Sequence, residues 1–199
     1  MGTPGRMRSW LRIEQLRPGA VSAFLRRMHA DWDGLPKQLL VFCTEFGELN
    51  RVLLFGDADA PMFDAASTGL RSSAPVLLEL QHRHGDLSHD ADARLFELRT
   101  YTPQSGQLER FLAAMLDAMP TRERYSRPLG IWTTRHDDRD QVLHIWPYRD
   151  LQHRDAARAG GGAEESWQHY GTFALGVLDH MTSNILVRPP NWPPQDAAP

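Results

Sequence analysis

The chain has 199 residues, of which 41% are hydrophobic and 24% charged, and its formal net charge is −3 at pH 7. This length allows one domain or two small ones with a hydrophobic core, and the slight negative charge excludes the overall positive field that is typical of nucleic-acid-binding proteins. No apolar run reaches the roughly 18 residues that a membrane-spanning helix needs, and the first residues lack the apolar core of a secretory signal, so we expect a cytoplasmic protein.

The N-terminal part of the chain predicts strands and helices in alternation. The stretch WLRIEQLRPGAVSAFLRRM (residues 10–28) contains a strand pattern, a Pro-Gly break and a helical stripe of apolar residues. Two strand candidates follow, LLVFCTEF and RVLLF, joined by the turn GELN. A short helical piece near residues 59–66 and a last strand at residues 75–81 complete this part.

A polar connector, HRHGDLSHDADAR (residues 82–94), comes next. It contains His82, His84 and His89 beside two aspartates, and borderline metals accept such ligands. Because the segment has no preorganised geometry, we interpret it as a solvated linker and expect no metal site. Cys43 is the only cysteine, so we expect no disulfide and no paired-thiol metal site, and we interpret it as a small buried hydrophobe.

The second part of the chain repeats the same order of elements. Residues 95–102 alternate as a strand does, and a helix with a continuous apolar stripe follows a Pro-Gly break. The stripe consists of Leu108, Phe111, Leu112, Met115, Leu116 and Met119. The segments LGIWTTR and QVLHIW predict a hairpin around the Asp-rich turn HDDRD. Helices are predicted over residues 150–159 and 163–178, divided by glycines 160–162, before a last strand at residues 183–189.

The two parts align at a constant offset, which indicates an internal duplication. Matched pairs are Leu11 with Leu98, Arg12 with Arg99, Gly19 with Gly106, Phe24 with Phe111, and Met28 with Met115. Strand, helix, strand, strand, helix, strand is the order of a ferredoxin-like unit. We therefore predict an α+β fold with a degenerate ferredoxin-like (βαββαβ) repeat and its linker in residues 1–93 and a second repeat in residues 94–199. The two would pack sheet to sheet as a dimeric α+β barrel within one chain.

Several motifs in order resemble the NIPSNAP family: FELRTYTPQSGQLERFL, LGIWTTR, QVLHIWPYRDLQHRDAAR and ILVRPP. The resemblance covers residues 95–190 closely and the first half only as a degenerate copy. It implies the dimeric α+β-barrel fold, which EthD-like proteins and antibiotic-biosynthesis-type monooxygenases share. It implies no particular reaction, because the animal members are mitochondria-associated, adaptor-like proteins and the bacterial members have no settled activity.

Strand alternation predicts which side chains line the cavity between the two sheets. If Phe96, Leu98 and Thr100 face the helices, the cavity is lined by Arg99, Tyr101, Trp132, Thr134, His144 and Trp146. Aromatic walls with a few polar groups are typical of a small-molecule pocket. The first repeat has Leu54 where the second has His144, which favours one pocket, built by the second half.

Each of these side chains also has a structural interpretation. His144 could be a general base or a hydrogen-bonded core residue. Arg99 could bind an anionic ligand or form an ion pair with Glu97 or Glu14. The two tryptophans could stack on a planar ligand or fill the barrel, and the tyrosine could donate a proton or satisfy a neighbouring group.

We hypothesise that the protein binds a small, aromatic or anionic molecule in the barrel. By analogy with related barrels it would act as a cofactor-independent oxygenase or isomerase, with His144 as base and Arg99 holding the developing negative charge. The alternative is a non-catalytic interaction or scaffold protein. We expect no cofactor, nucleic acid or membrane as partner, and self-association as a homodimer because sheet edges remain open.

Overall fold

The computed structural model describes residues 8–30, 39–57, 76–83 and 92–190. By its contacts the chain divides into two compact units. Unit one contains residues 1–79 and 185–199, and unit two contains residues 80–184. Each unit combines antiparallel strands with helices, so the expected α+β class is confirmed.

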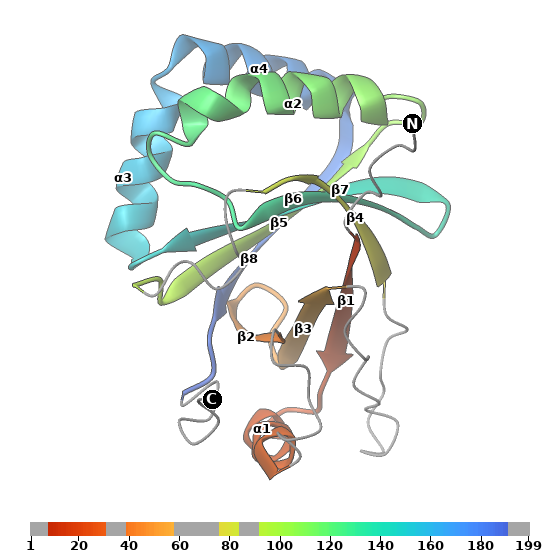
Figure 1. Ribbon diagram of the computed structural model, residues 1–199, viewed down its shortest axis with the longest axis vertical. Coiled ribbons are helices and arrows are strands. Elements are labelled where there is room, and N and C mark those ends of the chain that lie inside the picture. Colours follow the sequence, from red (N-terminus) through yellow and green to blue (C-terminus); the bar gives the residue numbers. More distant parts are fainter. Residues whose placement is uncertain (1–7, 31–38, 58–75, 84–91, 191–199) are drawn as a thin grey trace, which may run out of the picture. The chain divides into compact units, whose positions relative to one another are not determined.

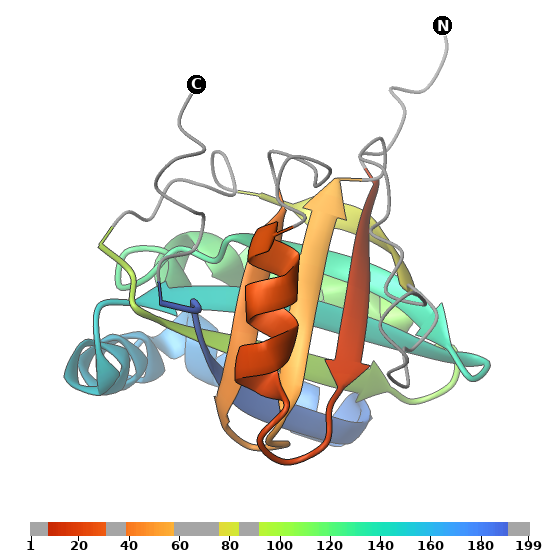
Figure 2. The same cartoon turned by 90° about the horizontal axis from the view of Figure 1, so that it is seen from below.

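Unit one is an antiparallel sheet with one described helix. It contains β1 (Arg8–Gln15), α1 (Val21–Ala30), β2 (Leu40–Phe46) and β3 (Arg51–Asp57), with the first residues of β4 (Val76–His82) and the last of β8 (Leu178–Val187). The hydrogen-bonded order is β4-β1-β3-β2-β8. Figure 2 shows α1 lying along the strands of this sheet.

The core of unit one lies between α1 and this sheet. Phe24 and Met28 of the helix pack with Trp10, Val41 and Leu54 of the strands, all buried. Partly buried apolar residues complete the stripe predicted for the helix, namely Val21 and Leu25. Spacing of three and four residues puts these side chains on one helix face, which explains why this segment forms an amphipathic helix.

Unit two has the same plan with more helical cover. It contains β5 (Leu95–Pro103), α2 (Leu108–Arg122), β6 (Gly130–His136), β7 (Arg139–Tyr148), α3 (Leu151–Gly162) and α4 (Glu165–Val177), with most of β8 and the end of β4. Its hydrogen-bonded order is β8-β5-β7-β6-β4. Helices α2, α3 and α4 lie on one face of these strands (Figure 1). None of the helices in the described ranges is long and apolar enough to cross a bilayer.

The order of the strands supports a ferredoxin-like half in each unit. In both units the fourth strand pairs with the first, the first with the third, and the third with the second. Gly19 and Gly106, matched by the constant offset, both have positive φ, 82° and 76°. Only glycine adopts this backbone readily, so the same turn precedes the first helix of each half.

Local sequence signals explain most of the other boundaries in unit two. Asp137 and Asp138 both have positive φ and form the tight β6–β7 turn that the HDDRD motif predicted. Asp150 caps α3, because its side chain accepts a hydrogen bond from the backbone N–H of His153 at 2.7 Å. The predicted helical piece near residues 59–66, and His84 and His89 of the connector, lie outside the described residues.

The glycine stretch does not divide the two helices as predicted. Gly160, Gly161 and Gly162 form the last turn of α3, and the break comes after them. A Cβ on Gly160 would lie 2.4 Å from the ring of Tyr125, and one on Gly161 would lie 2.8 Å from Cδ of Arg122. Gly160 and Gly161 are therefore explained by close approach of neighbouring side chains rather than by chain termination, whereas a Cβ on Gly162 would meet no atom within 4 Å.

Candidate functional site

Cross-strand register decides which predicted site residues share a face of the sheet in unit two. Arg99 of β5 pairs with His144 of β7, and Tyr101 pairs with Val142. Directly opposed residues point to the same side, and alternation adds Trp146 to that side. On β6, Ile131 pairs with His144, so Trp132 and Thr134 point to the other side. Four of the six predicted residues are thus brought together and two are separated from them.

The face that carries these four residues is covered by helices, which corrects the predicted orientation. The ring of Tyr101 lies edge-on to Phe111 of α2, with centroids 5.8 Å apart. The guanidinium of Arg122, also on α2, lies 4.4 Å from the ring of Trp146. The expectation that Arg99, Tyr101, His144 and Trp146 line a cavity between the sheets was wrong, because strand alternation gives a period but not its phase.

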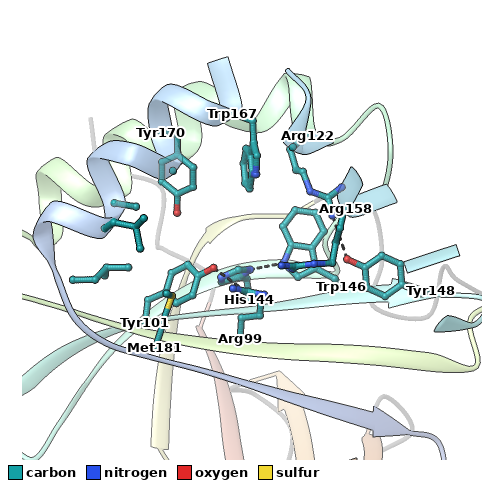
Figure 3. Close-up of a pocket in the computed structure, with 15 residues that line it drawn as sticks. Arg99, Tyr101, Arg122, His144, Trp146, Tyr148, Arg158, Trp167, Tyr170 and Met181 are labelled. Atoms are coloured by element: carbon teal, nitrogen blue, oxygen red, sulfur yellow. Dashed lines mark hydrogen bonds between the residues drawn. The ribbon is translucent and has the colours of Figure 1, made fainter. Parts of the chain in front are cut away.

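A cavity of about 320 Å³ lies between this face and helices α2, α3 and α4, within unit two (Figure 3). Polar groups and aromatic rings make up most of its wall. The lining includes Arg99, Tyr101, Arg122, His144, Trp146, Tyr148, Arg158, Trp167, Tyr170, Leu175, Leu178 and Met181. Trp132 and Thr134 do not belong to it. The size is at the lower end of the range of small-molecule pockets.

A buried carboxylate, Glu97, organises the positive charge below the cavity. It accepts hydrogen bonds from Arg99 at 2.9 Å, from Arg154 at 3.0 Å and from the hydroxyl of Ser183 at 2.7 Å, and Arg158 lies 3.6 Å away. Burial alone would raise the pKa of Glu97, but the bonds from Arg154 and Ser183 and the charges of Arg99 and Arg154 lower it to about 2. The structural interpretation of Arg99, an ion pair with Glu97, is confirmed.

His144 is buried and neutral at the bottom of the cavity. Its side chain is 2% exposed, and its Nδ1 accepts a hydrogen bond from the indole N–H of Trp146. Burial, and then the charge of Arg99, lowers the pKa of His144 well below its ordinary value of 6.5. Its Nε2 is buried and has no hydrogen-bond partner among the described residues.

Arg122 is a buried cation without a carboxylate partner among the described residues. It is 4% exposed, and one of its terminal nitrogens donates to the hydroxyl of Tyr148 at 3.2 Å. The other, Nη1, has no hydrogen-bond partner in the part of the chain that the structure describes. Burial lowers the pKa of Arg122 from 12.5, with Tyr148 acting in the opposite direction, but an arginine remains charged at neutral pH.

The helices supply the upper wall of the cavity, and sequence reasoning missed these residues. Trp167 and Tyr170, one turn apart on α4, pack against each other with ring centroids 4.9 Å apart and ring planes tilted by 49°. Tyr170 is buried, its hydroxyl has no partner in the described chain, and burial raises its pKa. Arg122 had a detectable signal, because it continues the apolar stripe of α2 three residues after Met119. A charged residue on an apolar stripe indicates a buried polar site.

Of the connector histidines proposed as alternative metal ligands, only His82 lies within the described residues. Its Nε2, at the end of β4, lies within hydrogen-bond distance of a carboxylate oxygen of Glu123, at 2.6 Å. Within residues 8–30, 39–57, 76–83 and 92–190, no group of three or more His, Cys, Asp or Glu side chains is placed to hold a metal ion.

Sequence comparison relates residues 96–192 to the NIPSNAP family. A NipSnap homologue 2 from Danio rerio is 25% identical over 118 residues, which are 59% of this chain and 41% of that protein. The chain spans less than half the length of this relative and of several other animal NipSnap homologues that it matches.

Two solved structures add family and fold information. An uncharacterised NIPSNAP domain protein from Burkholderia xenovorans is 31% identical, and the match covers 48% of this chain and 95% of that one, with a TM-score of 0.45. A proposed monooxygenase from Lactobacillus acidophilus is 11% identical, and the match covers 92% of this chain and 94% of that one, with a TM-score of 0.61. The second likeness shows a shared fold, that of the dimeric α+β-barrel class, over most of the chain.

Proposed function

The chain belongs to the NIPSNAP family through residues 96–192, and we propose that its unit two binds a small anionic molecule with an apolar or aromatic body. The binding site is the cavity between the sheet of unit two and helices α2, α3 and α4. The proposal concerns recognition of a ligand, and three features of the cavity wall support it: an unpaired cation, apolar surfaces around it, and the absence of a suitable base in the described lining.

The proposal rests on Arg122, which is buried and whose Nη1 has no hydrogen-bond partner among the described residues. A buried charge without an ion-pair partner in the described chain is costly, even though Tyr148 and the Trp146 ring offset part of this cost. A buried donor without an acceptor costs roughly 1–3 kcal/mol more. A carboxylate or phosphate in the cavity would remove both penalties by accepting from Nη1. Arg158, which also lines the cavity and is partly exposed, adds a second positive charge near the same end. Glu97 is already shared among three arginines, so the local charge stays positive without a ligand.

The rest of the wall fits an apolar or aromatic body. Trp146 and Trp167 flank Arg122, whose guanidinium lies 4.4 Å and 5.9 Å from their rings. Two apolar lining residues are exposed, Leu175 at 69% and Met181 at 46%. Met181 lies on the side of the cavity away from Arg122 (Figure 3). Exposed apolar side chains at a pocket rim are typical of a ligand entrance. The cationic and apolar ends together favour an amphipathic anion.

The same wall supports binding better than proton abstraction. A general base needs a free acceptor and a pKa near the working pH. Nδ1 of His144 already accepts from Trp146, and the low pKa of Glu97 makes its carboxylate a weak base. Burial raises the pKa values of Tyr148 and Tyr170, so both phenols stay protonated. The role of His144 as general base, considered from the sequence, is therefore replaced here by a binding role.

Calorimetric titration with aryl anions tests this proposal. We expect benzoate, 2-naphthoate or phenyl phosphate to bind, and 2-naphthamide, which lacks the charge, to bind at least tenfold more weakly than 2-naphthoate. Arg122→Leu should weaken binding of the anion about tenfold to a hundredfold, since a charge-assisted hydrogen bond contributes roughly 1.5–3 kcal/mol. Arg135→Leu, a change on β6 at an exposed arginine outside the cavity, is the matched control.

A stability measurement separates loss of binding from loss of folding. Arg122→Leu removes a buried charge that has no ion-pair partner in the described chain, but it also removes the hydrogen bond to Tyr148 and the contact with the Trp146 ring. These effects oppose each other, so the free energy of unfolding should change by less than about 1 kcal/mol, which is less than about 4 °C in unfolding temperature. If no anion of the panel binds, or if the amide binds as tightly as the acid, the proposal is wrong. The interaction or scaffold hypothesis would then be the better account of the protein.

A further inference from the structure

We infer that His144 and Tyr170 form a pair of neutral hydrogen-bond donors that holds an uncharged oxygen of the bound anion. This inference rests on the proposed function and refines it. The ligand would carry two polar groups, an acidic one beside Arg122 and a carbonyl or similar acceptor between His144 and Tyr170. Keto acids and acyl-substituted aryl acids belong to this chemical class.

The neighbour of His144 fixes which nitrogen carries its proton. An indole N–H only donates, so Nδ1 of His144 must accept from Trp146. A neutral imidazole has one N–H, and it therefore lies on Nε2. This N–H is buried and has no acceptor in the described chain. A ligand oxygen would satisfy it.

Tyr170 offers a second donor from the opposite wall. Its hydroxyl is buried without a partner among the described residues, although nearly all buried hydroxyls in proteins make a hydrogen bond. Burial keeps the phenol protonated, because it raises the pKa of Tyr170. In Figure 3 this hydroxyl points from α4 across the cavity toward the strand residues, including His144.

Packing holds the two donors in place. The ring of His144 lies 4.7 Å from Tyr101, whose hydroxyl is held by Arg99 at 2.8 Å. The ring of Tyr170 packs against Phe111 at 6.0 Å, and Phe111 packs against Tyr101. A carbonyl oxygen has two lone pairs and can accept from two such donors at once. Donors fixed before binding lose little entropy when the ligand arrives.

Two matched probes test the donor pair. We would compare 6-acetyl-2-naphthoate with 6-isopropenyl-2-naphthoate, which has the same shape and charge but a methylene group in place of the carbonyl oxygen. Wild-type protein should bind the acetyl compound about tenfold more tightly than the isopropenyl compound. In the isopropenyl complex the N–H of His144 and the hydroxyl of Tyr170 would have no acceptor. The carbonyl stretching frequency of the acetyl group should fall on binding, as it does when a carbonyl accepts hydrogen bonds.

Variants locate the preference in the two side chains. His144→Leu introduces the residue that the other repeat has at this place, Leu54. In this variant the dissociation constants of the two probes should differ by no more than about threefold, and the isopropenyl probe should still bind. Tyr170→Phe removes only the hydroxyl and should reduce the preference by a similar factor. Tyr125→Phe, a tyrosine outside the cavity wall, is the control and should keep the full preference.

The outcomes distinguish this inference from the proposed function. If both probes bind equally to wild-type protein, or if the preference survives in both variants, the donor pair is wrong and anion binding stands. If neither probe binds, the anion site fails and the donor pair fails with it.

Discussion

Glu97 is the residue whose replacement should disturb unit two most clearly. Glutamine has nearly the same shape as glutamate but no charge, so Glu97→Gln keeps the packing and removes the counter-ion of the surrounding arginines. Arg99 and Arg154 each donate to this carboxylate, and Arg158 lies 3.6 Å away. The variant would leave three positive charges around a neutral amide whose N–H₂ end also faces donors.

The pKa of the carboxyl sets the size of the effect. It falls from 4.5 to about 2, because the hydrogen bonds of Arg154 and Ser183 and the arginine charges outweigh burial. One pKa unit corresponds to about 1.4 kcal/mol, so the ionised form stabilises the fold by about 3 kcal/mol relative to the protonated form. Glu97→Gln should lower the free energy of unfolding by about this amount at pH 7. Breaking a buried ion pair on one side costs a similar roughly 3–5 kcal/mol.

Urea unfolding, followed by tryptophan fluorescence, measures this loss. Glu45→Gln, at an exposed glutamate of β2, is the matched control and should change the free energy of unfolding by less than about 0.5 kcal/mol. The folded-state pKa of Glu97 is depressed, so its contribution is complete above pH 4.5 and is lost as the pH falls toward 2. The difference between wild type and Glu97→Gln should therefore shrink over this window. A variant as stable as wild type at pH 7 would refute the reasoning.

Three glycine substitutions test the backbone, and a labelling experiment tests the thiol of Cys43. Gly130→Ala should cost about 1–3 kcal/mol in urea unfolding, because its Cβ would lie 2.5 Å from the buried ring of Trp132, whereas Gly171→Ala in α4 has open space and should stabilise by about 0.5–1 kcal/mol. Gly106→Ala should cost about 1 kcal/mol through its φ of +76° alone, and an unchanged midpoint would contradict this. Burial, and then Glu45, raises the pKa of Cys43 to about 11, so the thiol should react with iodoacetamide at pH 8 only after unfolding.

The periodicity of apolar residues in the sequence was sufficient to predict the helices and strands of the fold. The apolar stripe from Leu108 to Met119 became α2, and the Asp-rich turn became the β6–β7 hairpin. The order of these elements, present twice, predicted the ferredoxin-like halves. Such signals are local, because a helix face or a tight turn is specified by residues a few positions apart.

The orientation of the strands was not specified in the same way. A shift of one residue in phase moves every side chain to the other face, and both faces of β5 and β7 carry buried apolar and polar residues. Leu98 and Ile145 are as buried as Tyr101 and Trp146, so hydrophobicity did not identify the face that meets the helices. The predicted lining put Trp132 and His144 on one face, but Ile131 pairs with His144, so Trp132, its neighbour on β6, lies on the other face.

The site itself depends on residues that the repeat comparison could not highlight. Arg122, Trp167 and Tyr170 lie on helices, whereas the predicted cavity lining considered only strand positions. Arg122 and Tyr170 are 48 residues apart in the chain and line the same cavity only because α2 and α4 pack side by side over the sheet (Figure 1). Long-range pairings of this kind leave no periodic trace in one sequence.

The missing side chain at Gly161 has a consequence for protein engineering. A methyl group there would lie 2.8 Å from Cδ of Arg122, the flexible part of that side chain, and would force the guanidinium to a new position. A substitution at position 161 of α3 would therefore change the position of the Arg122 guanidinium on α2 without itself contacting a ligand. Libraries that vary position 161 offer a route to altered selectivity while the strand scaffold stays intact.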